Sequence, residues 1–186
     1  MHQKKSMILA QKKLIIFDWD GTLANSISHI VIAMQQAAKS VKQEPAKSID
    51  IQPLIGMGLT EVINKLYPKI SQDTLASFQK AYKEAYLHSP KCCLFEGVEN
   101  LLSDLTNKKI LLAIATGKSR SGLNRALEQT GVGHYFLDTK TADETASKPH
   151  PLMLEELLQI AQVNVDQALM IGDAECDMQM AVSIGM

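Results

Sequence analysis

The chain has little cysteine and no long apolar run, and each of these absences excludes a class of protein. Three cysteines, two of them adjacent at Cys92 and Cys93, provide neither a disulfide framework nor the paired spacing of a zinc site. We predict that they are reduced packing residues. The longest apolar run, Ile110 to Ala115, is far too short to cross a membrane.

The chain also lacks a net charge of either sign and an N-terminal targeting segment. Nineteen Lys and Arg residues against twenty Asp and Glu residues leave a formal charge of -1, which provides no basic surface for nucleic acid or an anionic membrane. The N-terminal residues contain too few consecutive apolar residues for a signal peptide. We therefore expect a cytoplasmic protein with no nucleic-acid partner and no membrane partner.

What the chain does contain is the composition of a folded domain. Its 186 residues are enough for one domain, or for a core domain with a small insertion. Apolar residues make up 46% and charged residues 21%, values close to those of globular proteins, which excludes wholesale disorder.

Short apolar runs and helical stripes alternate along most of the chain. The runs Leu14 to Phe17, Ile110 to Ala115 and Ala168 to Ile171 predict buried strands. This alternation predicts an α/β fold, with a Rossmann-like parallel sheet covered by helices on both faces. The helical stripes are Val98, Leu101, Leu102 and Leu105; Leu123, Ala126 and Leu127; Leu154, Leu157, Leu158 and Ala161, after Pro151; and Met178, Ala181 and Val182.

The segment from residue 26 to residue 94 has no convincing strand. Ser26 and Ser71 can each cap a helix, and a shorter helix is expected after the loop IGMGLT, whose Gly56 and Gly58 permit tight turns. We predict that residues 1–25 and 95–186 form the core and that residues 26–94 form an inserted, all-helical domain. The expected inward faces are Ile27, Ile30, Val31, Met34, Ala38 and Val41 in the first helix, and Leu75, Phe78, Tyr82 and Ala85 in the later one.

Polar residues follow the predicted strands, at the edge of a parallel sheet where ligands bind. Asp18 and Asp20 come directly after the first strand and before a Gly-Thr turn. Two carboxylates at this spacing repel each other and need a cation or a shared proton. By themselves, two carboxylates at this spacing more often belong to a solvated loop or a helix cap, and their place after a buried strand favours a site.

Two further segments carry groups suited to a phosphate. Thr116 and the backbone of Gly117 and Lys118 follow the second strand, where they could bind a phosphate or simply cap the next helix. Lys148, restricted by the following Pro149, could present a fixed positive charge or be an ordinary solvated side chain.

The last strand ends in a second pair of carboxylates. Asp173 and Asp177 are four residues apart, so they share one face of a helix, and oxygen ligands at a strand end suit Mg²⁺. The alternative is that Asp173 caps the helix and Asp177 is a surface charge.

Together these segments resemble the four motifs of the haloacid dehalogenase superfamily, here DWDGT, ATG, KP and GDxxxD. The helical insertion resembles the cap of the subfamily that includes phosphoglycolate phosphatases. The resemblance implies a Rossmann-like core with a helical cap, and Mg²⁺-dependent phosphoryl transfer through an aspartyl-phosphate. It also implies a continuation beyond Met186 into another strand and helix, so we expect a truncated C-terminus.

The resemblance also implies a role for each matching residue. Asp18 corresponds to the nucleophile and metal ligand, and Asp20 to the general acid/base, whose main-chain carbonyl also binds the metal. The other matches are Thr116 and Lys148, which hold the phosphoryl group and neutralise the nucleophile; Asp173, a metal ligand; Asp177, its neighbour in the metal site; and the backbone amides of Trp19, Asp20 and Gly117, which bind phosphate.

Two residues depart from the pattern of the superfamily, and the motifs do not identify the substrate. Asn25 replaces the usual Asp, with little effect expected on catalysis, and the bulky Trp19 is expected to narrow the entrance. We expect the IGMGLT loop, with Gly58, to face the substrate. The polar residues of the insertion that could either reach a substrate or be solvent-exposed are Thr60, Lys65, His88 and Lys91.

The leading hypothesis is a phosphatase that acts on a small phosphorylated metabolite, with phosphoglycolate-like compounds as the first class to test. We expect a monomer or weak dimer. The alternatives are a phosphosugar mutase or other phosphotransferase, which shares the same motifs, and a catalytically silent module that binds a phosphorylated ligand.

Overall fold

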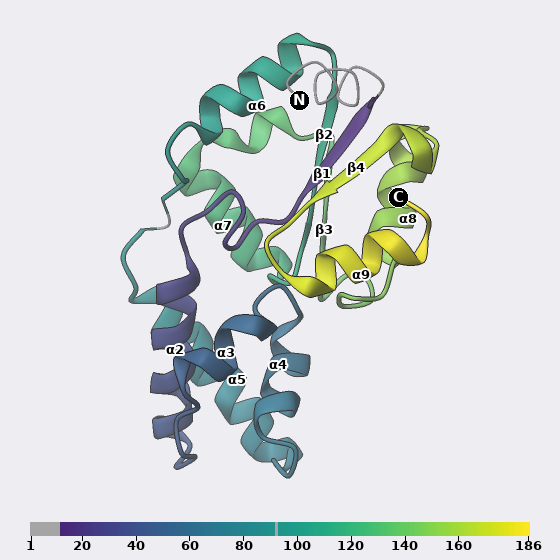
Figure 1. Ribbon diagram of the computed structural model, residues 1–186. Helices are drawn as coiled ribbons and strands as arrows, with labels where there is room; N and C mark the ends of the chain where they lie inside the picture. The colour runs from purple at the N-terminus through teal and green to yellow at the C-terminus, as the bar shows by residue number, and fades with distance from the viewer. Residues whose placement is uncertain (1–11, 92) are drawn as a thin grey trace.

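A computed structural model describes residues 12–91 and 93–186, and its core is a four-stranded parallel sheet (Figure 1). The strand order is β3-β2-β1-β4. Phe17 at the end of β1 is paired with Ile114 of β2 and Ile171 of β4, so the polar segments that follow these strands meet at one edge. The strands are β1 (Leu14–Phe17), β2 (Leu111–Thr116), β3 (Asp138–Thr141) and β4 (Ala168–Ile171).

Helices cover both faces of the sheet, which confirms the predicted α/β fold. Alternate residues of β1 belong to two apolar clusters: Ile15 and Phe17 pack with α6 and α7, whereas Leu14 and Ile16 pack with α8 and α9. All four side chains are at most 1% exposed. The elements on the two faces are α6 (Val98–Asn107), α7 (Arg120–Thr130), α8 (Leu152–Ala161) and α9 (Glu175–Ser183), with short 3-10 turns η2 (Val132–Tyr135) and η3 (Val165–Gln167).

Between β1 and α6 the regular elements are all helices, which we call the helical region (residues 27–87). Its buried side chains, Phe78 and Ile63 among them, form a third apolar cluster. Figure 1 shows this region as a separate group beyond the carboxyl ends of the strands. Its elements are α2 (Ile27–Ser40), α3 (Ser48–Ile51), η1 (Gln52–Leu54), α4 (Leu59–Leu66) and α5 (Gln72–Leu87).

The chain enters and leaves the helical region through two adjacent segments. The N–H of Asn25 donates to the carbonyl oxygen of Cys93 at 2.9 Å, and the N–H of Phe95 donates to that of Leu23 at 3.0 Å. These bonds pair the two connections side by side, directly after the Asp18 to Asp20 segment.

The observed strands differ from the predicted ones in two places. β2 begins and ends one residue later than expected. β3 was not predicted, because its sequence, DTKT, has no apolar run. It is an edge strand that pairs only with β2 in the described sheet, and polar residues are common on edges.

Two predicted helix caps have different outcomes. Ser71 caps α5 as expected, since its hydroxyl accepts the N–H of Thr74. Ser26 occupies the N-cap position of α2, but its side chain makes no capping bond and donates to Asp20 instead.

The cysteines are only partly as predicted. Cys176 is buried, Cys93 is exposed, and Cys92 lies outside the described residues. No helix of the described chain is long and apolar enough to cross a membrane.

Candidate active site

Four motif residues meet where the parallel strands end. Asp18 follows β1, Thr116 ends β2, Lys148 lies on the segment after β3, and Asp173 follows β4. The backbone N–H of Asp18 donates to the carbonyl oxygen of Ile171 at 2.8 Å, which holds the β1 and β4 segments together one residue beyond the strands. The parallel register therefore brings residues up to 155 positions apart in the chain into one site.

A buried lysine between two buried carboxylates is the centre of this site. Lys148 Nζ lies 2.7 Å from Asp18 Oδ1 and 2.6 Å from Asp177 Oδ1, and the three side chains are at most 1% exposed. Burial opposes the charged form of Lys148, but the two carboxylates outweigh it and raise its pKa. Burial, together with the charges of Asp177 and Asp20, raises the pKa of Asp18 to about 7 against the opposing effect of Lys148.

This geometry excludes the solvated and capping alternatives for two sequence motifs. Lys148 is not a solvated side chain and Asp177 is not a surface charge. Asp173 does not cap α9: the N-cap residue is Ala174, and its N–H is bound by Asp177 Oδ2 at 3.2 Å. Asp177 thus fixes both the start of α9 and the position of Lys148.

Carboxylate oxygens of Asp18, Asp173 and Asp177 lie within 4.8 Å of one another and form a cluster able to hold a divalent cation. Asp18 Oδ2 is buried and has no hydrogen-bond partner among the described residues, as expected of an atom whose partner is a ligand. Asp173 is exposed and accepts a bond from Thr22 Oγ1 at 2.9 Å. Hard oxygen donors of this kind fit Mg²⁺.

A glycine turn and a protonated thiol lie beside the carboxylate cluster. Gly21 has a φ of +84°, and a Cβ there would collide with the Asp173 carboxylate, so this turn needs glycine. Burial, with the charge of Asp177, raises the pKa of Cys176 to about 11. This thiol therefore stays protonated near neutral pH and is a poor nucleophile.

The side chain of Asp20 lies outside the cation cluster and has partners of its own. Its Oδ1 accepts bonds from Ser26 Oγ at 2.6 Å and Lys118 Nζ at 2.9 Å, and Oδ2 lies 3.1 Å from the same Nζ. Lys118 Nζ also lies 4.9 Å from the centre of the Tyr86 ring, on α5. The Asp20 carboxylate therefore contacts the first connection to the helical region directly, and α5 through Lys118.

Thr116 and Gly117 lie beneath a loop of the helical region. Thr116 is buried, and its Oγ1 accepts the N–H of Lys118 at 3.2 Å. It does not cap a helix, because α7 begins at Arg120 after its N-cap Ser119. A Cβ on Gly117 would collide with the carbonyl oxygens of Gly56 and Met57, so the two backbones are in close contact.

The loop from Gly56 to Gly58 also contacts the segments after β3 and β4. The N–H of Gly58 donates to Ser147 Oγ at 2.7 Å, and a Cβ on Gly56 would touch Cys176 and Ala174. The loop that the sequence predicted to face the substrate therefore lies directly over the phosphate-binding candidates.

The indole of Trp19 is not at the entrance, contrary to expectation. It is 0% exposed and packs in the core cluster with Leu23 and Val98. Its backbone remains beside Asp18 and Asp20. Asn25 is exposed.

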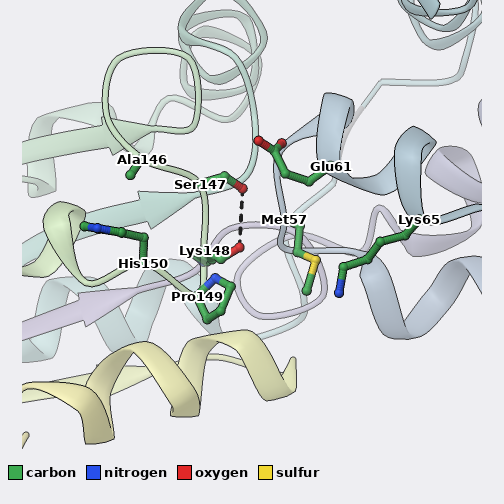
Figure 2. A pocket seen from close by; sticks show the side chains of 8 residues that line it. All are labelled: Met57, Glu61, Lys65, Ala146, Ser147, Lys148, Pro149 and His150. Atoms are coloured by element: carbon green, nitrogen blue, oxygen red, sulfur yellow. Dashed lines mark hydrogen bonds between the residues drawn. The ribbon is translucent and has the colours of Figure 1, made fainter. Parts of the chain in front are cut away.

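A pocket of about 530 Å³ lies between α4 and the segment that carries Lys148 (Figure 2). Figure 2 shows Met57, Glu61 and Lys65 on one wall, facing Ser147 and Pro149 on the other. Lys65 is the one member of the four candidate polar residues that lines it. The other three, Thr60, His88 and Lys91, are exposed; Thr60 accepts a bond from Gln79, and His88 bonds to the carbonyl oxygen of Glu84.

Comparison with known proteins settles the family. The profile of haloacid dehalogenase-like hydrolases matches residues 15–186. The chain belongs to this family.

The hydrolase is similar along most of its length to phosphatases. The phosphoglycolate phosphatase of Vibrio cholerae is 30% identical over 183 residues, 93% of this chain and 81% of the relative. The crystal structure of a predicted phosphoglycolate phosphatase from Haemophilus somnus has a TM-score of 0.84 at 25% identity, covering 94% of this chain and 83% of that one. CbbY of Rhodobacter sphaeroides, in complex with xylulose-(1,5)bisphosphate, has a TM-score of 0.81 at 19% identity, with coverages of 94% and 84%, and shares the fold.

These matches confirm both the family and the enzyme class predicted from the four motifs, a phosphoric monoester hydrolase. The sequence did not single out the side chain of Lys118 in this hydrolase. The available signal was its place directly after the ATG motif, but its partner Asp20 lies 98 residues away.

Lys148→Met should strongly destabilise the metal-free hydrolase. The substitution leaves Asp18 and Asp177 facing each other in a buried site without their shared cation, and breaking such a buried pair costs about 3–5 kcal/mol. The free energy of unfolding would be measured by denaturant titration in EDTA.

Lys140→Met is the matched control for that measurement. Lys140 makes a partly exposed ion pair with Glu156 at 2.9 Å, and its loss should cost at most about 1 kcal/mol. Equal losses in the two variants would contradict the role of Lys148 as the buried counterion.

Proposed function

We propose that this hydrolase is a Mg²⁺-dependent phosphatase that hydrolyses a small phosphate monoester through an aspartyl-phosphate on Asp18. The observation that carries the proposal is the state of the Asp18 carboxylate. Lys148 holds Oδ1, the buried Oδ2 has no hydrogen-bond partner among the described residues, and Asp18 belongs to the carboxylate cluster. A carboxylate held this way is oriented, and one of its oxygens is available.

Asp18, Asp173 and the main-chain carbonyl of Asp20 are the proposed Mg²⁺ ligands. Asp177 lies in the same cluster, but its oxygens already bind Lys148 and the N–H of Ala174, so we assign it the role of fixing Lys148 beside the cation. When bound, Mg²⁺ would supply positive charge that offsets the repulsion between the carboxylates and a phosphate dianion.

Asp18 is the proposed nucleophile of the first step. A carboxylate oxygen forms a bond to phosphorus as the bond from phosphorus to the ester oxygen breaks. Lys148 neutralises the nucleophile and the incoming phosphoryl group. The hydroxyl of Thr116 and the backbone amides of Trp19, Asp20 and Gly117 would bind the phosphoryl oxygens.

Asp20 is the proposed acid and then base. Its carboxyl gives a proton to the departing ester oxygen, which leaves as an alcohol. In the second step a water attacks phosphorus, its proton goes to Asp20, and the bond from phosphorus to Asp18 breaks, releasing inorganic phosphate. Both enzyme carboxyl groups end in their starting forms.

We propose that the helical region, with its flanking connections at residues 26–94, acts as a cap over this chemistry. The loop from Gly56 to Gly58 contacts the segments after β2, β3 and β4, and such contacts would exclude water from a bound phosphoryl group. The two paired connections at Asn25 and Phe95 are the proposed hinge.

Phosphoglycolate-like esters are the proposed substrates. The names of the similar phosphatases support this class. A phosphotransferase would instead consume a sugar phosphate without releasing inorganic phosphate. The silent binding module is disfavoured because Asp18, Asp20, Lys148 and Asp173 are all present.

Phosphate release from a panel of phosphorylated metabolites should require Mg²⁺. We expect excess EDTA to lower turnover by about 100-fold or more and Mg²⁺ to restore it. Ca²⁺ should inhibit, because its larger coordination number favours binding of Asp18 through both oxygens. Undiminished turnover in EDTA, or equal rates with both metals, would contradict the proposal.

We expect the rise in Tm that Mg²⁺ causes to depend on pH. Without metal, the pKa of Asp18 is raised to about 7 in the folded chain, so the folded chain binds this proton more tightly than the unfolded chain does. The stabilisation that the proton provides is lost as the pH rises from about 4 to about 7. Below pH 7 the cation must displace the proton. The rise in Tm on adding Mg²⁺ should therefore be larger at pH 8 than at pH 6.

A further inference from the structure

Lys118 is a buried cation in the site whose charge the proposed reaction does not use. Its side chain is 8% exposed, and its ammonium lies 2.9 and 3.1 Å from the two oxygens of Asp20. The same ammonium lies 3.4 Å from the hydroxyl oxygen of Tyr86, whose ring is 5.9 Å from that of Tyr82. One basic group is thus held between the acid/base residue and Tyr86 of α5, which Tyr82 stacks against.

The position of Lys118 places it beside the leaving group of a substrate. A general acid must reach the ester oxygen within one hydrogen bond. Lys118 Nζ is within 3.1 Å of both oxygens of Asp20, so the ammonium and the acid/base carboxylate are neighbours in the site. A carboxylate on the carbon next to the ester oxygen would therefore lie near the ammonium.

We propose that Lys118 is the residue that recognises the substrate, by binding a carboxylate on the carbon that bears the ester oxygen. The inference rests on the proposed function and names its substrate class: phosphorylated α-hydroxy acids, such as phosphoglycolate. The substrate carboxylate takes the ammonium from Asp20, and Asp20, now without its counterion, takes up a proton from water and turns toward the ester oxygen. Asp20 returns this proton to water when Lys118 binds it again after product release, so binding of the correct substrate makes the acid available.

The other cations near the site do not fill this role. Lys148 Nζ already binds Asp18 and Asp177, both of which the site needs in place. Lys65 is exposed, and Figure 2 shows it on the pocket wall beside Met57 and Glu61. Among the described residues, Lys118 is the buried cation whose partner must leave it during the proposed reaction.

The two tyrosines give the site the properties of an anion receptor. The Tyr86 ring, 4.9 Å from the ammonium and stacked on Tyr82, shields it from water, which strengthens a charge-assisted hydrogen bond to a carboxylate. The Tyr86 hydroxyl lies close enough to share that carboxylate. Because both rings come from α5, the receptor is complete only when α5 lies over the core, so carboxylate binding would also favour this closed arrangement.

The test compares two esters that differ in the carboxylate. Phosphoglycolate and 2-hydroxyethyl phosphate carry the same phosphoryl group, but the second has a hydroxymethyl group in place of the carboxylate. Lys118→Met should lower the ratio of their kcat/KM values by about 10- to 100-fold, the contribution of one charge-assisted hydrogen bond. Using the ratio cancels any general effect of the substitution on folding or on Asp20.

Two further variants complete the comparison. Lys118→Arg, which keeps the charge, should retain more of the preference than Lys118→Met. Lys140→Met, which removes a lysine paired with Glu156 away from the site, should leave the ratio at the wild-type value. An unchanged ratio in Lys118→Met would overturn the proposal and leave Lys118 as a positioning residue for Asp20.

A binding measurement separates this inference from the proposed function. In an Asp18→Asn background, which cannot form the aspartyl-phosphate, calorimetry would measure the affinity for phosphoglycolate with and without Lys118→Met. A loss of about 10- to 100-fold, absent for 2-hydroxyethyl phosphate, supports the receptor even if the wild type does not hydrolyse phosphoglycolate. Equal affinities, or no binding of phosphoglycolate, would overturn it even if the wild type is an active phosphatase.

Discussion

Asp18→Asn is expected to abolish measurable phosphoryl transfer, with turnover falling by about 10⁵-fold or more. An amide is not a nucleophile toward phosphorus, so the aspartyl-phosphate cannot form. The variant should still fold, because the amide oxygen can accept the bond from Lys148 and Asp177 remains as the charged partner of that lysine. Steady-state phosphate release and rapid acid quench would measure the loss.

The control for Asp18→Asn is a carboxylate far from the strand ends. Asp166→Asn changes an exposed residue of η3 by the same atoms and should leave turnover unchanged. The Tm of both variants would show whether lost activity reflects lost folding. Wild-type turnover in Asp18→Asn would mean that another residue is the nucleophile.

The sheet could be predicted only as far as its strands are apolar. β1 and β4 have the predicted bounds, and β2 is displaced by one residue. These three strands could be found because their side chains belong to the apolar clusters on the two faces of the sheet. β3 could not be found, since an edge strand with a polar sequence has neither alternation nor a run of apolar residues. Its pairing with β2 is a tertiary contact that no local pattern encodes.

The candidate site could be predicted where its residues lie at the carboxyl ends of apolar strands. Asp18 and Asp173 come just after β1 and β4, Thr116 is the last residue of β2, and parallel topology then brings the three together. The partners of the charges could not be predicted in the same way. Lys148 is 29 residues from Asp177 and Lys118 is 98 residues from Asp20, and only the folded chain decides which lysine meets which carboxylate.

Lys148 and Lys118 bind carboxylates in two separate parts of the site. Lys148 binds within the cluster of Asp18, Asp173 and Asp177, where an oxygen remains available for a cation. Lys118 binds Asp20, whose side chain is turned away from that cluster toward Ser26 and α5. Asp18 and Asp20 are two residues apart in the sequence, yet the fold gives them different partners, and this difference leads to the last prediction.

Asp20→Asn should lower turnover by about 10²–10⁴-fold without removing the nucleophile. The substitution keeps the backbone carbonyl proposed to bind Mg²⁺, and the amide oxygen can still accept bonds from Ser26 and Lys118. It removes the proton that the departing alcohol needs and the base that activates water in the second step. Esters with poor leaving groups should therefore be affected most.

An ester whose leaving group needs no proton separates the two steps. With p-nitrophenyl phosphate, formation of the aspartyl-phosphate should survive in Asp20→Asn better than its hydrolysis, which still lacks the base. The phosphorylated enzyme should then accumulate, and intact-mass spectrometry after rapid acid quench should find the mass of one added phosphoryl group. Asp18→Asn should show no such addition. If Asp18→Asn is phosphorylated in the site, or if Asp20→Asn turns over both kinds of ester at wild-type rates, the two carboxylates do not have the roles that their different partners indicate.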